Sequence, residues 1–194
     1  MKKKVLNEFY EWTESILFAL IMVIVILTFI IRGTRVDGDS MLPTLEDSQF
    51  LTISHLYTEL RHGDIVVVFA KDIDGTNSNG RNVIKRVIGL PGDTVRIDTA
   101  AGLVYRNGEA LPVEFRDGLV YENNYTISDT TRTRFDIPEG VDWLVPENHV
   151  FVMGDNRNYS KDSRSGDVGM IDMNYVIGRV IFRVTPFSEL GRVV

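Results

Sequence analysis

Cysteine is absent from this chain of 194 residues, and so is any long run of basic residues. The first absence excludes disulfide bonds, a thiol nucleophile and cysteine-ligated metal sites. The second, together with a formal net charge of −6, argues against nucleic acid as a partner. The three histidines, His55, His62 and His149, are too scattered to indicate a metal site. We therefore expect neither a metal nor another cofactor.

Charge is also absent from one stretch near the N-terminus, Ile16–Ile31, which only the mildly polar Thr28 interrupts. As a helix this stretch is roughly 24 Å long, slightly less than a hydrocarbon core of about 30 Å. Tyr10 and Trp12 on one side and Arg32 on the other can extend it to the two interfaces. The stretch therefore predicts a single membrane span.

A cleaved signal peptide is the alternative interpretation of this N-terminus, because the basic patch Lys2–Lys4 precedes the apolar stretch. A signal peptide would have a shorter apolar part and a small-x-small site, which the residues after Ile31 lack. We therefore expect a retained anchor in the cell membrane. The lysines favour a cytoplasmic N-terminus, although Arg32 and Arg35 partly offset them. The expected organisation is a cytoplasmic segment at 1–14, a transmembrane helix at 15–31 and an extracytoplasmic domain at 32–194.

The part beyond the span, about 160 residues, is long enough for one domain with its own core. Its short runs of branched residues, bounded by Gly, Pro, Asp or Asn, predict strands at 65–69, 82–88, 94–97, 150–153 and 176–184. An Asn-Gly pair between extended flanks predicts a hairpin at 104–109. Two stretches, 71–81 and 117–141, look irregular. The predicted fold class is mainly β, mostly antiparallel, with a smaller β insertion within about 100–145.

A serine and a lysine carry the clearest chemical signal. Ser40 stands nine positions beyond the apolar stretch, and Lys85 lies inside the apolar run Val83–Ile88. A serine hydroxyl is a weak nucleophile until a base removes its proton, and a lysine can be that base only when it is neutral. Strand alternation places Val83 and Val87 on the same face as Lys85, so desolvation should lower its pKa.

The neighbouring Arg86 has the same apolar flanks on the opposite face. Periodicity therefore does not say which of the two cations points inward. Chemistry favours Lys85 as the base, because an arginine stays charged in proteins and could not accept the serine proton.

Four blocks in this order resemble those of the type I, or bacterial-type, signal peptidases: 40–45, 63–67, 84–93 and 154–164. The resemblance covers nearly the whole chain and is closest to the Gram-positive variant. It implies an extracytoplasmic serine-lysine endopeptidase with a β catalytic domain. Such an enzyme cuts signal peptides from exported preproteins after small residues at the first and third positions before the bond. The implied partners are those signal peptides and membrane lipid.

The resemblance also assigns roles to residues. Ser40 would form an acyl-enzyme, Lys85 would act as general base, and Ser160 would hold the lysine amine through its hydroxyl. Arg86 would form a structural ion pair. The supporting polar network would consist of Asp155, Arg157, Asp162, Ser163 and Arg164, for which the alternative is a solvated turn. The pocket for the small side chain would consist of Val36, Met41, Leu45 and Ile84, for which the alternative is plain core.

Two residues depart from the pattern that some members of the family show. Gly38 stands where they carry a serine that helps to hold the developing negative charge, which leaves the Ser40 N–H as the candidate donor. Lys161 follows Ser160, where a small or neutral residue is expected. Its amine could lower the pKa of Lys85 by like-charge repulsion, or it could point to solvent.

Apolar residues near the nucleophile could dock the domain on the bilayer, with Phe50, Leu51, Ile53 and Pro186-Phe187 as candidates, or they could be core. Two other classes of protein stay open. A self-cleaving serine-lysine regulator would need an internal small-residue cleavage site and usually a DNA-binding region, and we find neither. A membrane-anchored β-domain for binding would survive the loss of Ser40 and Lys85. Sortase-type transpeptidation is disfavoured because cysteine is absent.

Overall fold

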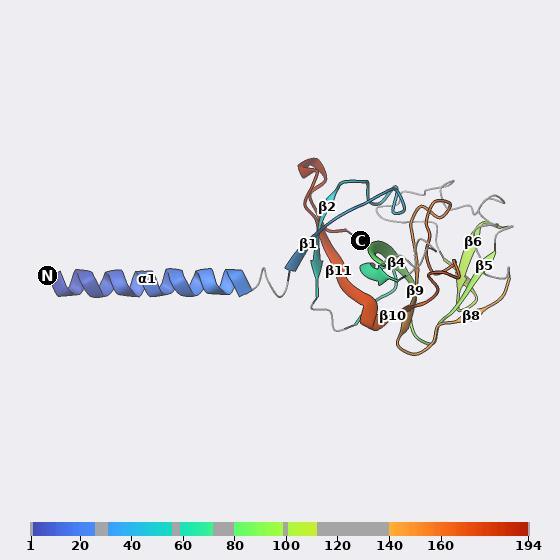
Figure 1. Cartoon of the computed structure of the whole chain (residues 1–194), viewed down its shortest axis with the longest axis horizontal. Coiled ribbons are helices and arrows are strands. Elements are labelled where there is room, and N and C mark those ends of the chain that lie inside the picture. Colours follow the sequence, from blue (N-terminus) through green and yellow to red (C-terminus); the bar gives the residue numbers. More distant parts are fainter. Residues whose placement is uncertain are drawn as a thin grey trace.

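The computed structural model describes residues 2–25, 31–55, 59–71, 80–98, 101–111 and 140–193 (Figure 1). The chain begins with the helix α1, Lys2–Val25. Within these ranges, no helix is long and apolar enough to cross a membrane. Residues 26–30 of the expected span lie outside the described ranges. The expectation of a helix that includes Ile31 is wrong. Ile31 begins strand β1, because the backbone from Ile31 to Arg35 pairs with the strand that follows it.

Among the described residues, the larger sheet has seven strands in the order β1-β2-β11-β3-β4-β9-β10, and every neighbouring pair is antiparallel. The strands are β1 (Ile31–Arg35), β2 (Phe50–Ser54), β3 (Ile65–Ala70), β4 (Arg81–Gly89), β9 (His149–Met153), β10 (Ile171–Asp172) and β11 (Val176–Arg183). Two 3₁₀ turns, η2 (Met173–Tyr175) and η3 (Phe187–Glu189), flank β11. The expected antiparallel β architecture is confirmed.

The smaller sheet has four strands within the described part of the chain, in the order β7-β6-β5-β8. They are β5 (Thr94–Asp98), β6 (Leu103–Arg106), β7 (Glu109–Ala110) and β8 (Trp143–Leu144). Asn107 and Gly108 both have positive φ, 53° and 82°, which the tight turn of a two-residue hairpin requires. This confirms the predicted hairpin. Residues 112–139, and with them most of the stretch 117–141, lie outside the described part of the chain.

Both faces of the centre of the larger sheet are buried. Along β3 and β4, alternate residues enter two different apolar clusters, with Val67 and Ile84 in one and Val66 and Val87 in the other. Burial on both faces explains why these strands are nearly continuous runs of branched residues.

Leu51 and Ile53 on β2 belong to the same buried cluster as Val67, with exposures of 0% and 3%. They are therefore core residues, and the expectation that they could dock on a bilayer is wrong for these two. Phe50 and Phe187, in contrast, are 43% and 80% exposed.

Candidate active site

An open cleft lies along the first half of β4. It exists because β9 pairs with β4 only from Arg86 onward, so the stretch 81–85 is hydrogen-bonded to β3 alone. The loop that follows β1 faces this edge. The cleft has a volume of about 270 Å³ and is lined by Thr34–Ser40, Val67, Arg81–Lys85, Tyr159 and Lys161.

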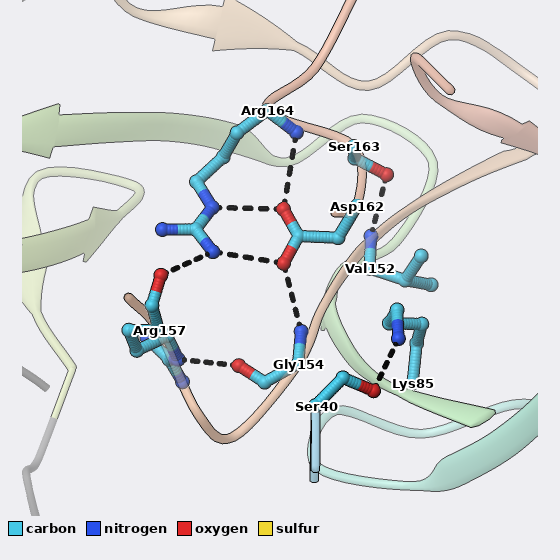
Figure 2. Close-up of polar contacts among 8 residues, drawn as sticks. All are labelled: Ser40, Lys85, Val152, Gly154, Arg157, Asp162, Ser163 and Arg164. Carbon is cyan, nitrogen blue, oxygen red and sulfur yellow. Dashed lines mark hydrogen bonds and ion pairs between the residues drawn. The ribbon is translucent and has the colours of Figure 1, made fainter. Parts of the chain in front are cut away.

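Ser40 and Lys85 meet in this cleft. The Lys85 amine donates a hydrogen bond to Ser40 Oγ at 2.8 Å (Figure 2). It donates another to the carbonyl oxygen of Ile84 at 3.0 Å. Lys85 is only 3% exposed. The two residues that the sequence singled out are thus in direct contact, although 45 positions separate them.

The Lys85 amine is a weak base in this environment. Burial lowers its pKa from 10.5 to about 8, because desolvation disfavours the ammonium form. The carboxylates of Asp162 and Asp155 act in the opposite direction, and Arg81 and Arg164 lower the pKa further. A substantial fraction of the amine is therefore neutral near pH 8, and a neutral amine can accept a proton.

Arg86 binds on the opposite side of β4. Its guanidinium makes a two-pronged ion pair with the Asp155 carboxylate, at 2.8 and 2.7 Å, and also donates to the carbonyl oxygen of Gly63 at 2.8 Å. The Arg86 and Asp155 side chains are 3% and 0% exposed. Arg86 thus has the ion pair that the family resemblance implied, and Lys85 alone of the two cations reaches Ser40.

A second buried ion pair organises the segment after β9. Arg164 binds both carboxylate oxygens of Asp162, at 2.8 and 2.9 Å, and both side chains are 0% exposed (Figure 2). Burial alone would raise the pKa of the Asp162 carboxyl, but Arg164 and a hydrogen bond from the Gly154 N–H hold that pKa below its ordinary value. This stretch is therefore a buried network and not a solvated turn.

The remaining members of the network fix the backbone. Arg157 donates from Nε to the Gly154 carbonyl at 3.0 Å, and Arg164 donates to the Arg157 carbonyl at 2.8 Å. The Ser163 hydroxyl accepts from the Val152 N–H at 3.0 Å, which ties the segment to β9. Five residues of the predicted network, Asp155, Arg157, Asp162, Ser163 and Arg164, are thus all buried.

This network is joined directly to the nucleophile segment. The Asn156 N–H donates to the Ser40 carbonyl at 3.0 Å, and the Asn156 side chain donates to the Asp39 carbonyl at 3.1 Å. Gly154 lies so close to Ser160 and to the Ser40 carbonyl that a Cβ atom there would collide with both. Sequence reasoning missed Gly154 and Asn156 as contact residues, and the Gly-Asp-Asn run, which is typical of an ordinary turn, gave no signal of this packing.

Ser160 is 4% exposed and lies beside Gly154. Its hydroxyl makes no hydrogen bond within the described residues, although it is near enough to the Asp162 carboxylate to favour the charged form of that group. The hydrogen bond to Lys85 that the resemblance implies is therefore not formed here. The role of Ser160 in holding the amine stays a prediction.

Gly38 and Lys161, the two departures, both line the cleft. Gly38 has a φ of 82° and donates its N–H to Asp47 at 2.8 Å, which holds the turn before the nucleophile. No acceptor within the described ranges is bonded to the Ser40 N–H. Lys161 forms a surface ion pair with Asp167 at 2.7 Å and is 37% exposed, so its amine is turned away from the core.

The four residues proposed for the small side-chain pocket divide into two pairs. Val36 and Ile84 border the cleft, whereas Met41 and Leu45 do not border it. All four belong to one buried cluster. Residues that sequence reasoning missed are Arg81, Asn82 and Tyr159, which complete the cleft wall. Strand pairing reveals Arg81 and Asn82, because it leaves this edge of β4 open, and Tyr159 comes from the segment after β9.

The histidines lie elsewhere. His62 bonds to Asp93 at 2.6 Å, and His149 bonds to the Glu147 carbonyl at 2.9 Å. Neither these two nor His55 borders the cleft. A hydroxyl beside a buried, weakly basic amine in an open cleft is a geometry suited to serine hydrolase chemistry.

Comparison with known proteins identifies the family. The chain matches the family described as signal peptidase, peptidase S26, over residues 9–185. It is similar to signal peptidase I of Bacillus licheniformis, with 34% identity over 189 residues that cover 96% of this chain and 94% of the relative. It is also similar to signal peptidase IB of Staphylococcus aureus (strain COL), with 32% identity over 97% of this chain and 94% of the relative. The chain therefore belongs to the signal peptidase family, peptidase S26.

One solved structure of the family is also similar. A crystal structure of a signal peptidase I from Enterococcus faecalis is 27% identical and covers 63% of this chain and 97% of that chain, with a TM-score of 0.39.

Proposed function

We propose that this protein is a membrane-anchored signal peptidase I that hydrolyses the peptide bond after small-x-small motifs, with Ser40 as nucleophile and Lys85 as general base. The contact of 2.8 Å between Ser40 Oγ and the Lys85 amine carries the proposal. This distance lies within the range in which a base can take a hydroxyl proton. The pKa of about 8 supports it, because much of the amine is neutral at a mildly alkaline pH.

In the first half-reaction, Lys85 takes the Ser40 proton while Oγ forms a bond to the scissile carbonyl carbon. The Ser40 N–H is the candidate donor to the developing oxyanion, since no protein acceptor within the described ranges engages it. The carbon–nitrogen bond then breaks, and the proton held by Lys85 passes to the leaving amine. The products are the acyl-enzyme and the free N-terminus of the mature protein.

In the second half-reaction, a water molecule attacks the acyl-enzyme. Lys85, neutral again, takes the water proton, and the tetrahedral intermediate expels Ser40 Oγ, which recovers its proton from the ammonium. Both steps need the amine at one fixed position. The Ile84 carbonyl, 3.0 Å from the amine, helps to hold it there.

Specificity for small side chains is consistent with the apolar cleft wall. Val36 and Ile84 are 3% and 9% exposed and border the cleft beside the reacting pair. Behind them, Met41 and Leu45 are packed in the core, so they would limit the depth of a pocket and not line it. Shallow apolar walls accept small residues and exclude large ones by steric overlap.

Anchoring by the apolar stretch Ile16–Ile30 is part of the proposal and rests on the sequence alone. It would place the domain at the lipid surface, where its exposed side chains Phe50 and Phe187 could reach the bilayer. A membrane-bound enzyme meets a membrane-bound preprotein at a raised effective concentration.

The test is cleavage of a labelled preprotein by the full chain in detergent, compared with Ser40→Ala and Lys85→Ala. We expect wild-type protein to release one mature product, and each variant to stay folded by circular dichroism and cut at least a thousandfold more slowly. If folded Ser40→Ala still cleaves the preprotein at the wild-type rate, the mechanism is refuted. Binding of the preprotein without cleavage by wild type would favour a binding domain, and cleavage of the chain itself would favour a self-cleaving regulator.

A further inference from the structure

Arg81 is a cation in the same cleft as Lys85. It is the first residue of β4 and is exposed, and it borders the cleft together with Ser40 and Lys85. Strand alternation places Arg81, Val83 and Lys85 on one face of β4. The Cα atoms of Arg81 and Lys85 lie roughly 13 Å apart along the extended strand. Both side chains are long enough to bring their charges closer together than this.

The position of Arg81 is fixed by the sheet. The Arg81 backbone pairs with Ala70 at the end of β3, and Gly80 before it packs so tightly against Ala70 and Lys71 that a Cβ atom there would collide with them. The start of β4 is thus held in place relative to Lys85.

Several other charges face the same amine. The carboxylates of Asp162 and Asp155 favour its protonated form, but each of them is bound by an arginine in a buried ion pair. β3 contributes no charge, since Ile65–Ala70 is apolar throughout. The other charged or titratable groups of the cleft and its network are Arg35, Asp37, Asp39, Arg86, Arg157, Tyr159, Lys161 and Arg164.

We propose that Arg81 is a positioning residue of the active site, whose positive charge opposes a second positive charge in the cleft and so increases the neutral fraction of Lys85. Burial is the main reason that the pKa of Lys85 is low, and Arg81 is the larger of the two cationic influences that lower it further. The inference rests on the proposed function, because it matters only if Lys85 is the base.

The experiment is the pH profile of kcat/KM for preprotein cleavage by wild type and by Arg81→Gln, Arg81→Lys and Arg81→Glu. For two charges about 10 Å apart near a protein surface, loss of the cation should raise the midpoint of the alkaline rise by about 0.3 to 1 pH unit. Arg81→Glu should raise it about twice as far, and Arg81→Lys should leave it near the wild-type value. All four proteins should reach the same alkaline plateau.

The control is Arg96→Gln, which removes an arginine of the smaller sheet that does not border the cleft. Its side chain is 37% exposed and lies 3.9 Å from Asp142. The midpoint should not move in this variant. Added salt should shrink the shift of Arg81→Gln, because ions screen interactions between exposed charges.

Two outcomes overturn the inference. A loss of the same factor at every pH, with an unchanged midpoint, would make Arg81 a substrate or folding residue, and an unchanged profile would give it no role. Wild-type protein that does not cleave, or whose rate does not rise with pH, would instead refute the proposed function. The wild-type measurement therefore separates the two failures.

Discussion

Lys85 and Arg86 are consecutive residues of β4, yet their side chains bind partners on opposite sides of the strand. Lys85 contacts Ser40 Oγ at 2.8 Å, and Arg86 forms a two-pronged ion pair with Asp155. One face of the strand thus carries the chemistry while the other attaches the strand to the segment after β9. This division explains why two adjacent cations can both be buried, at 3% exposure each.

The first prediction is that cleavage by wild-type protein rises with pH through about 8. The pKa of Lys85 is lowered to about 8, and its neutral form is the one that accepts the Ser40 proton. Below this pH the active fraction should fall about tenfold per unit, and above it the rate should level off. The measurement is kcat/KM from pH 6 to 10 in one detergent. A rate that falls as the solution becomes alkaline would contradict a lysine base.

The second prediction is that the buried Lys85 ammonium lowers the free energy of unfolding at neutral pH. Its pKa is 10.5 ordinarily and about 8 in the fold, a difference that corresponds to about 3 kcal/mol. The cost is complete below pH 8, because the folded state must then hold a buried ammonium. It disappears between pH 8 and 10.5, where the folded state is already neutral and the unfolded chain still binds the proton.

Inactive Lys85→Met should therefore be more stable than wild type at pH 7, by about 1–2 kcal/mol after the loss of the two hydrogen bonds. The gain should shrink towards pH 10.5. Urea unfolding at both pH values, followed by tryptophan fluorescence, measures it. A variant that is less stable than wild type at pH 7 would show that Lys85 is held in the fold without a cost.

The third prediction concerns the buried pair of Arg86 and Asp155. Arg86→Met leaves the Asp155 carboxylate buried without its partner, and the expected loss in the free energy of unfolding is about 3–5 kcal/mol. Adding Asp155→Leu should recover part of that loss, because the stranded charge is then gone. The matched control is Arg96→Met, whose exposed pair with Asp142 should matter by less than about 1 kcal/mol. Equal losses in the single and double variants would show that the ion pair is not what stabilises this contact.

Much of the fold could be predicted from sequence because the strands follow simple patterns. The five predicted runs are β3, β4, β5, β9 and β11, and the Asn-Gly pair forms the expected turn. β1 and β2 were not predicted. Ile31 continues the apolar run of the N-terminus, so local composition hides the start of β1. In β2, apolar residues such as Leu51 and Ile53 are typical both of a core and of a membrane-facing surface, so their residue types do not distinguish the two.

The candidate site was predictable in its chemistry but not in its contacts. Alternation could not separate Lys85 from Arg86, because β4 is buried on both faces and the two sides carry the same apolar signal. The open edge at Arg81–Lys85 depends on where β9 ends its pairing, which is a long-range feature. The close packing of Gly154 on Ser40 is likewise long-range, since 114 positions separate the two residues.

The last prediction tests that packing. In Gly154→Ala the added methyl group would meet the Ser160 side chain and the Ser40 carbonyl oxygen, and the second of these is backbone that cannot rotate away. We expect the fold to lose about 1–3 kcal/mol through overpacking. We also expect cleavage to fall by roughly a hundredfold, because a displacement of about 1 Å at the nucleophile costs that much. Single-turnover cleavage at a temperature where the variant is fully folded separates the two effects.

The control is Gly191→Ala, where a Cβ atom meets nothing within 4 Å, and it should behave as wild type. If folded Gly154→Ala cleaves at the wild-type rate, the segment after β9 can move without displacing Ser40, and the close contact between them does not position the nucleophile.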